Sequence, residues 1–388
     1  MKIAVVVGTR PEIIKMAPVV RACRARGAPC LLLHTGQHYS FELDGVFFAE
    51  LDLPAPDVNL EIGSGSQTHQ VASAMLGLEP VLKAHRPDIV LVEGDTNSVL
   101  AAALAANQAG IAVGHVEAGL RSYDRGMPEE INRILTDHVS DHLFAPTAGA
   151  RTILRGEGIP ESCIHVTGNT VVDELLLQRE RARRPGLLGR FGVEAGRYAL
   201  ATVHRAENVD REDRLRGILA GLAAAGDALG LVVLAALHPR TQARIAAADP
   251  TLTARLRVLP PLGYLDFLGL HADAALVLTD SGGLQEEACC LRVPCVTLRD
   301  NTERPESVEV GANVLAGADP GRIVACARAM HAAPRDWPNP FGDGRSGERI
   351  VDLLLDQGAQ GAAGSHRADR ERARDVWRPG YRTAAGDA

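Results

Sequence analysis

Short apolar runs alternate with longer amphipathic segments along most of this chain. The runs in the first half occupy residues 3–7, 30–35, 89–94, 111–116 and 142–147, and those in the second half occupy residues 198–204, 231–238, 256–262, 274–280 and 294–300. Strand-length runs that recur with helical segments between them predict βαβ units and a parallel sheet. The pattern therefore predicts an α/β fold with one series of strands in each half.

The repeated series predicts two domains of the same architecture, because 388 residues are too many for one typical core. We expect an N-terminal domain over residues 1–168 and a C-terminal domain over residues 169–345. A helix over residues 346–356 should pack back on the first domain. Residues 357–388 combine low hydrophobicity with many charges, which is typical of a disordered tail.

Composition narrows the class of protein. The net charge of −7 argues against binding to nucleic acid, but a locally positive pocket would still suit a small anionic substrate. Seven cysteines without regular spacing favour reduced thiols in the cytoplasm. The most apolar stretch, residues 99–113, is interrupted by Asn107, Gln108 and Gly110, so we expect no membrane span. Met1 and Lys2 lead directly into a strand, which argues against a signal peptide.

Carboxylates gather at predicted strand ends in the first half. Asp95 and Glu117 each come just after a predicted strand, and Glu129 and Glu130 stand at a predicted helix start. In an open parallel sheet, the crevice beyond the carboxyl ends of the strands is the usual ligand site. Converging carboxylates suit proton transfer, since burial and mutual repulsion separate their pKa values. For any one of these acids alone, helix capping is the simpler interpretation; three together favour a site.

A glycine-containing turn follows a predicted strand in each half, and such turns bind anions through backbone N–H groups and a helix N-terminus. In the second half, Ser281 can cap the following helix, and Gly282 and Gly283 permit close approach of a phosphate. Glu287, one helical turn further, suits paired ribose hydroxyls. Without context, an ordinary glycine-rich turn with a surface glutamate is an equally good interpretation.

Basic side chains accompany both turns. Arg10 and Lys15 follow the first turn, and His204 and His238 end two neighbouring strands of the second half. Arg304 adds a forked donor matched to phosphate. One histidine at a strand end is usually structural, but two facing the same crevice favour contact with a diphosphate leaving group. The pattern fits a nucleotide-sugar enzyme whose C-terminal domain holds the nucleoside diphosphate and whose N-terminal domain presents acids to the sugar.

Eight motifs then make the chain recognisable. In order from residue 8 to residue 306 they are GTRPEIIK, TGQH, GDTNSVLAA, HVEAGLRSYDRGMPEEINR, GNTVVDEL, HRAEN, TDSGGLQEEA and DNTERPE. Together they resemble the non-hydrolysing UDP-N-acetylglucosamine 2-epimerases, and the resemblance continues through NPFGDGRSGERIVDLL. It implies a GT-B-type α/β fold of two Rossmann-like domains facing a central cleft, and a homodimer. The implied activity is interconversion of UDP-GlcNAc and UDP-ManNAc without a metal or a redox cofactor.

The resemblance also implies residue roles. The acid/base candidates are Asp95, Glu117 and Glu129, and His204 would stabilise the departing diphosphate. The implied substrate and UDP contacts are Arg10, Lys15, Arg133, His238, Ser281, Gly282, Gly283, Glu287 and Arg304. Only Glu130 keeps the capping interpretation. Which carboxylate serves which face of the sugar stays open.

Two departures and several alternatives qualify this interpretation. Ala206 replaces an arginine found in many bacterial relatives, and residues 63–70 lack an arginine with which relatives bind a second, activating UDP-GlcNAc. We therefore expect no substrate activation.

The alternatives are an epimerase for another UDP-sugar, such as a 2,3-diacetamido-uronic acid, and a hydrolysing epimerase. From other classes, a GT-B glycosyltransferase and a nucleotide-sugar sensor share the UDP site.

Overall fold

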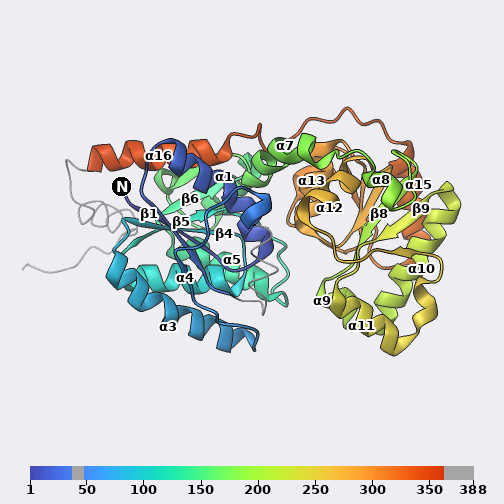
Figure 1. The fold of residues 1–388 in the computed structure, drawn as a ribbon, viewed down its shortest axis with the longest axis horizontal. Helices are drawn as coiled ribbons and strands as arrows, with labels where there is room; N and C mark the ends of the chain where they lie inside the picture. Colours follow the sequence, from blue (N-terminus) through green and yellow to red (C-terminus); the bar gives the residue numbers. More distant parts are fainter. Residues whose placement is uncertain (37–47, 362–388) are drawn as a thin grey trace, which may run out of the picture.

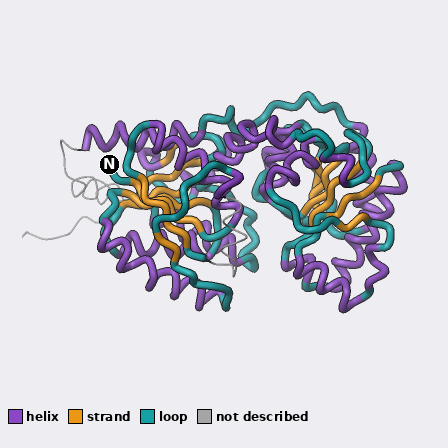
Figure 2. Tube along the Cα trace, viewed as in Figure 1, coloured by secondary structure: helices purple, strands orange, loops and turns teal. Residues whose placement is uncertain are grey.

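The structure, a computed structural model, describes residues 1–36 and 48–361 and consists of two lobes (Figure 1). Each lobe has a parallel sheet at its centre and helices on both faces (Figure 2). We call them the N-terminal lobe and the C-terminal lobe. The predicted α/β class of GT-B type is confirmed by this architecture. Residues 37 and 38 of the TGQH motif lie outside the described residues.

The sheet of the N-terminal lobe has seven strands in the order β3-β2-β1-β4-β5-β6-β7, paired in parallel. They are β1 (Ile3–Val7), β2 (Cys30–His34), β3 (Val58–Asn59), β4 (Ile89–Glu93), β5 (Ala112–Val116), β6 (His142–Ala145) and β7 (Ile164–Val166). The five apolar runs predicted here are strands. The pattern missed β3 and β7, the two edge strands, which are too short to show a period.

Alternation along β1 explains why its sequence is apolar throughout. Ile3 and Val5 face a core shared with α1 and α16, while Ala4 and Val6 face a second core shared with α3 and α4. Successive strand residues point to opposite faces, and here helices cover both faces. A continuous apolar run is therefore the expected signature of this strand.

The sheet of the C-terminal lobe has six strands in the order β10-β9-β8-β11-β12-β13, also paired in parallel. They are β8 (Tyr198–Thr202), β9 (Val232–Ala235), β10 (Arg257–Val258), β11 (Leu276–Thr279), β12 (Cys295–Thr297) and β13 (Asn313–Leu315). The five predicted runs are again strands, and β13 was missed. In both sheets the chain first builds outward from a central strand and then reverses direction, as in Rossmann-like folds.

Helices complete both lobes. The helices that precede β8 in the sequence are α1 (Arg10–Ala25), α3 (Gln67–His85), α4 (Asn97–Gln108), α5 (Pro128–Val139), α6 (Ala148–Gly156), α7 (Thr170–Ala182) and α8 (Leu187–Arg190). The remainder are α9 (Ala206–Val209), α10 (Glu212–Leu229), α11 (Pro239–Ala248), α12 (Tyr264–Ala272), α13 (Gly282–Leu291), α14 (Pro305–Glu309), α15 (Pro320–Ala332) and α16 (Ser346–Gly361). Short 3₁₀ turns occupy Glu161–Cys163 and Pro250–Thr253.

The chain crosses between the lobes twice. It first crosses at α7, which packs against α1 and α16 on one side and against α12 and α13 on the other. It then returns from α15 to α16, which lies along α1 (Figure 1). Helix α16 continues past the predicted end at residue 356 as far as Gly361. Residues 362–388, which carry most of the predicted tail, lie outside the described residues.

Candidate active site

The carboxyl ends of strands from both lobes meet at one cleft of about 500 Å³. The cleft lies where strand order reverses in each sheet, which is the usual ligand site of open α/β sheets. It is lined by every residue predicted for the site except Glu129; these residues are Arg10, Lys15, Asp95, Glu117, Arg133, His204, His238, Ser281, Gly282, Gly283, Glu287 and Arg304.

One wall of the cleft begins with the turn after β1. A Cβ added to Gly8 would stand 2.2 Å from Oγ of Ser98, so only glycine fits there. The Glu12 carboxylate accepts hydrogen bonds from the backbone N–H of Gly8 at 2.6 Å and from the hydroxyl of Thr9 at 2.8 Å. Burial raises the pKa of Glu12 to about 7. These contacts hold the turn so that the N-terminus of α1 borders the cleft.

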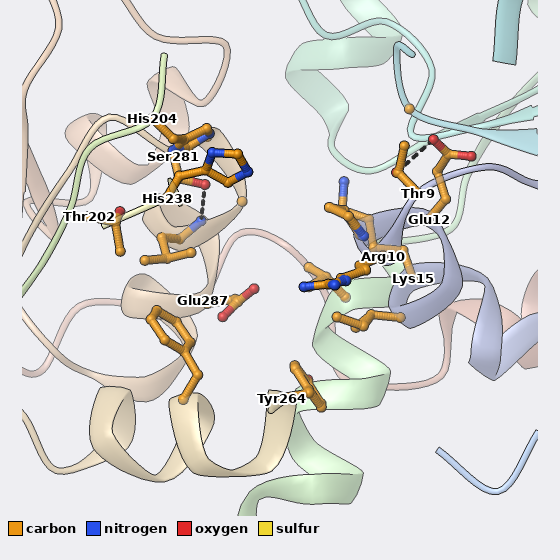
Figure 3. Close-up of a pocket in the computed structure, with 18 of the residues that line it drawn as sticks. Thr9, Arg10, Glu12, Lys15, Thr202, His204, His238, Tyr264, Ser281 and Glu287 are labelled. Atoms are coloured by element: carbon orange, nitrogen blue, oxygen red, sulfur yellow. Dashed lines mark hydrogen bonds between the residues drawn. The ribbon is translucent and has the colours of Figure 1, made fainter. Parts of the chain in front are cut away.

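Side chains that can donate hydrogen bonds face each other across the cleft. Arg10 and Lys15 come from α1 in the N-terminal lobe, and His204, His238 and Ser281 come from the opposite lobe (Figure 3). The imidazole Nδ1 of His238 also accepts a hydrogen bond from the backbone N–H at position 240, at 3.2 Å, and so caps α11. Both walls therefore carry groups that interact with phosphate oxygens.

Glu117 is the most constrained carboxylate of the site. It is 4% exposed and has φ of 68°, a left-handed conformation that non-glycine residues rarely adopt. Its carboxylate accepts hydrogen bonds from Lys15, from Arg304 and, at 3.2 Å, from the amide of Asn169. Burial alone would raise the pKa of Glu117, but Lys15 and Arg304 hold it well below its usual value. Glu117 is thus an ionised carboxylate in a water-poor place.

Glu93, the last residue of β4, was missed by the sequence analysis. It is 1% exposed, lines the cleft, and accepts a hydrogen bond from Nζ of Lys15 at 2.8 Å. Burial, with repulsion from Glu117, raises the pKa of Glu93 well above its usual value despite Lys15. The available signal was an acid within the otherwise apolar run over residues 89–94.

Asp95 is held by Arg133, and the capping interpretation is wrong for it. The guanidinium of Arg133 donates to the Asp95 carboxylate, whereas the hydroxyl of Thr96 caps α4. Arg133 is 2% exposed and also donates to Glu130 at 2.8 Å. This pairing fixes Asp95 at the floor of the strand-end crevice.

The capping prediction for Glu130 is wrong. Its buried carboxylate accepts hydrogen bonds from the backbone N–H groups of Ser122 and Tyr123, both at 2.9 Å, rather than from the start of its own helix. Burial opposes ionisation, but these N–H groups and Arg133 lower the pKa of Glu130. Glu130 therefore anchors the loop before α5.

Glu129 lies at the rim of the cleft. Its side chain is 39% exposed, and a carboxylate oxygen stands 3.7 Å from a guanidinium nitrogen of Arg205 in the opposite lobe. Arg205 does line the cleft. The structure thus brings Glu129 near the site through a contact between lobes, without placing it in the lining.

The opposite wall holds the glycine turn after β11. The hydroxyl of Ser281 accepts a hydrogen bond from the backbone N–H of Leu284 at 3.5 Å and so caps α13, as predicted. A Cβ added to Gly282 would stand 3.0 Å from the Arg304 guanidinium, while nothing lies within 4 Å of one added to Gly283. The helix N-terminus and its glycines therefore border open space in the cleft.

Asp280, a second residue that the sequence analysis missed, positions His204. Its carboxylate lies 2.9 Å from Nδ1 of His204 and accepts hydrogen bonds from the backbone N–H groups of His204 and Arg205. Burial would raise the pKa of Asp280, but His204 and these donors lower it to about 2. The ionised carboxylate fixes the imidazole so that its other nitrogen is available to the cleft.

Glu287 stands in the cleft above α12 (Figure 3). The rings of Tyr264 and Phe267 line the cleft from α12. One turn further along the helix, the buried His271 has Nδ1 3.5 Å from the Glu287 carboxylate. A carboxylate beside two aromatic rings suits the ribose and base of a nucleoside.

Arg304 joins the two lobes. Its guanidinium donates to Glu117 of the N-terminal lobe and stands 3.2 Å from the Glu286 carboxylate on α13. Asn169 bridges the same two acids. Burial raises the pKa of Glu286 to about 7, in spite of Arg304. Arg304 and Arg133 therefore border the cleft and also form ion pairs with carboxylates of the protein.

Two absences concern the described residues only. Within residues 1–36 and 48–361, no group of three or more His, Cys, Asp or Glu side chains is arranged to hold a metal ion. Over the same part of the chain, no helix is both long and apolar enough to cross a membrane.

Comparison with known proteins identifies the relatives of this chain. The family model described as UDP-N-acetylglucosamine 2-epimerase matches residues 21–355. A UDP-N-acetylglucosamine 2-epimerase of Methanocaldococcus jannaschii is 48% identical over 91% of this chain and 99% of its own length. The UDP-2,3-diacetamido-2,3-dideoxy-D-glucuronate 2-epimerase of Pseudomonas aeruginosa is 41% identical, over 91% of this chain and 99% of its own.

A solved structure agrees. The crystal structure of the Methanocaldococcus jannaschii UDP-GlcNAc 2-epimerase in complex with UDP-GlcNAc and UDP superposes with a TM-score of 0.87. The two chains are 48% identical, and the match covers 92% of this chain and 99% of that one.

Proposed function

The chain belongs to the UDP-N-acetylglucosamine 2-epimerase family, and on this basis we propose that its cleft interconverts UDP-GlcNAc and UDP-ManNAc. The observation that carries the proposal is the cleft itself. A phosphate-binding turn and a ribose-suited carboxylate stand on one wall, and buried carboxylates stand on the other. A nucleoside diphosphate held by the first wall presents its sugar to the second.

The chemistry explains why several carboxylates are needed. The proton on C2 of the sugar is not adjacent to a carbonyl, so simple deprotonation is too unfavourable. Instead, the C1–O bond to UDP breaks as C2 loses its proton, which leaves a C1–C2 alkene. UDP then adds back to C1 while C2 is protonated on the opposite face. The stereochemistry changes at C2 only, and no atoms are gained or lost.

The C-terminal lobe supplies the stabilisation that the leaving UDP requires. The N-terminal amides of α13, at Gly282 and Gly283, border the cleft and would donate to a diphosphate there, as would Arg10 from α1. His204, fixed by Asp280, is placed to donate to the leaving phosphate oxygen. Donors aimed at the developing charge act most strongly where water is excluded.

The N-terminal lobe supplies the groups that exchange the C2 proton. Glu117 is ionised and can accept a proton. Asp95 and Glu129 stand in different surroundings, one paired with the buried Arg133 and the other partly exposed at the rim. These two acids are the further candidates for proton transfer at the two faces of the sugar.

A second substrate has a specific observation in its favour. The 41% identical relative from Pseudomonas aeruginosa is named for a UDP-2,3-diacetamido-uronate. The same elimination and re-addition would apply to that sugar. UDP-GlcNAc is the first choice because the 48% identical relative is named for it.

The test is to incubate the protein with UDP-GlcNAc in deuterated water and to follow the sugar by NMR. Deuterium at C2 with UDP still attached supports the proposal, and a parallel incubation with the diacetamido-uronate compares the two substrates. Free sugar in place of a UDP-sugar indicates a hydrolysing epimerase. The absence of exchange with both substrates contradicts epimerisation and favours a glycosyltransferase or a sensor.

Three further features belong to the same proposal. We expect a homodimer, no affinity for nucleic acid, and a cytoplasmic location. The net charge of −7 supports the second expectation, since affinity for nucleic acid depends on neutralising phosphates. We also expect hyperbolic kinetics. Position 206 is alanine instead of arginine, and residues 63–70 lack the arginine with which relatives bind an activating UDP-GlcNAc.

A further inference from the structure

Five charged groups form a buried cluster at the cleft, four of them in its lining, and their charges do not balance. The carboxyl groups are Glu93, Glu117 and Glu286, which are 1%, 4% and 0% exposed. The cations are Lys15, whose side chain is 12% exposed, and Arg304, which is 5% exposed. Three carboxylates against two cations leave one negative charge uncompensated. Because an unpaired buried charge is very costly, one carboxyl group must hold a proton.

Hydrogen bonds indicate which carboxyl group holds it. Glu117 receives donors from Lys15, Arg304 and Asn169. Glu286 accepts a hydrogen bond from the amide of Asn169 at 2.9 Å and forms an ion pair with Nε of Arg304 at 3.2 Å, where the geometry of a hydrogen bond is not met. Among the described residues, Glu93 receives one donor only, Nζ of Lys15 at 2.8 Å. Hydrogen-bond donors and nearby cations stabilise the ionised form of an acid. Glu286 has one of each, whereas Glu93 has only Lys15, which it shares with Glu117, so Glu93 keeps the proton.

The electrostatics of the cluster agree with this assignment. Burial raises the pKa of Glu93 well above its usual value, and the neighbouring Glu117 adds to the effect while Lys15 opposes it. For Glu117, Lys15 and Arg304 outweigh burial and lower the pKa. The two acids, which share Lys15, are therefore driven to opposite protonation states.

We propose that Glu93 is a positioning residue that stays neutral, as a carboxylic acid, and thereby keeps Glu117 ionised and bound to Lys15. This inference rests on the proposed function, in which Glu117 exchanges the C2 proton. Glu93 keeps its own proton throughout the cycle, so the proton balance of the reaction is unchanged. Ionised Glu93 would draw Lys15 away from Glu117 and place a second negative charge beside the site. Activity then falls at alkaline pH as Glu93 ionises.

The groups facing Glu93 set this pH dependence. They are Lys15 on α1, Glu117 after β5, and, through the same cluster, Glu286 on α13 and Arg304 before α14. Lys15 and Arg304 remain charged at the relevant pH, and Glu117 remains ionised. Glu286, whose pKa is raised to about 7, is already ionised when the alkaline range is reached. The alkaline limb of the activity profile is therefore assigned to Glu93.

Two substitutions at one position test the proposal. Glu93→Ala removes the neutral hydrogen-bonding group and should lower kcat by about 10²-fold, the scale of a lost proton-transfer arrangement. Glu93→Gln preserves the size and neutrality of the group, so it should restore most of that loss and remove the alkaline limb of the kcat profile. Glu117→Gln is the matched control. It removes the ionised carboxylate itself, so we expect a low kcat in this variant, whereas Glu93→Gln should keep most of the wild-type kcat.

Each outcome is decisive. If Glu93→Gln loses as much activity as Glu117→Gln, Glu93 itself exchanges protons and the proposal is overturned. If Glu93→Gln keeps the wild-type pH profile, Glu93 is not the titrating group. Infrared spectroscopy of the unliganded protein gives a readout without turnover. Glu12 and Glu286 are also partly protonated at pH 7, so the measurement is the difference spectrum between wild type and Glu93→Gln, in which the carbonyl band of one neutral carboxylic acid should be lost. That band is observable even if the deuterium experiment disproves epimerisation.

Discussion

Asp280 shows how one residue determines the state of another. Its carboxylate accepts the backbone N–H groups of His204 and Arg205 and lies against the imidazole of His204, with no exposed surface of its own. The resulting pKa of about 2, against an ordinary 3.8, means that the folded state favours the ionised form. Neither the turn sequence nor the histidine alone indicates this pairing.

The pairing of Asp280 predicts a pH dependence of stability. Between its folded and unfolded pKa values the unfolded chain binds more protons, so the stabilisation from Asp280 is present above about pH 4 and is lost as the pH falls through about 2. The shift corresponds to about 2 kcal/mol of unfolding free energy. Urea unfolding between pH 5 and pH 2 should show a shallower decline for Asp280→Asn than for wild type.

Comparing wild type with Asp280→Asn isolates the contribution of Asp280 to the pH dependence, because all other acids titrate in both proteins. Equal slopes for wild type and Asp280→Asn over this pH range would mean that the carboxylate does not gain stabilisation from folding.

At the scale of elements, the start of α5 places two adjacent acids in different surroundings. Glu129 is partly exposed and faces Arg205 across the cleft, whereas Glu130 is 1% exposed and holds the loop at Ser122 and Tyr123. Helical geometry causes the split, because adjacent residues on a helix point about 100° apart. The two identical residues therefore have different partners, and we infer different roles for them.

This difference predicts opposite effects of matched substitutions. Glu129→Gln should lower kcat by about 10²-fold or more with little change in unfolding free energy. Glu130→Ala should lower the unfolding free energy by about 3–5 kcal/mol, because it leaves two buried backbone N–H groups unpaired and removes a buried carboxylate that Arg133 contacts. Initial rates and urea unfolding of both variants provide the measurement. A stable Glu130→Ala, or an unstable Glu129→Gln, would refute the division.

Over the whole molecule, the last helix completes a core that begins with the first strand. Ile350, Val351 and Leu354 of α16 are fully buried against α1 in the core of the N-terminal lobe. Helix α7 contacts both of these helices and also α12 and α13 of the other lobe. The C-terminal segment thus supports the helix that carries Arg10 and Lys15 into the cleft.

Leu354 should therefore matter to stability despite its distance from the cleft. Leu354→Ala leaves a cavity in a closed core and should reduce the unfolding free energy by about 2–5 kcal/mol. Asp356→Ala, an exposed position on the same helix, is the matched control and should change it little. The measurement is the unfolding free energy of both variants by chemical denaturation. Similar values would mean that α16 is not part of the cooperative core.

Sequence patterns determined the elements whose signal is local. Continuous apolar runs identified the central strands because both faces of each sheet are buried, and the glycine turns with Ser281 identified the helix starts that border the cleft. The short edge strands β3, β7 and β13 carry no such period. Family motifs supplied the residues of the cleft, and all but Glu129 line it.

The protonation states and pairings were decided by the tertiary structure alone. Lys15 and Glu93 are 78 residues apart, and Arg304 and Glu117 are 187 apart. Sequence spacing contains no information on such contacts, nor on the burial that raises or lowers each pKa. For that reason the sequence identified the carboxylates near the strand ends but took Glu130 for a cap and overlooked Glu93 and Asp280. Folding brings these charges together in a water-poor space, where burial, nearby charges and hydrogen-bond donors set the pKa of each acid.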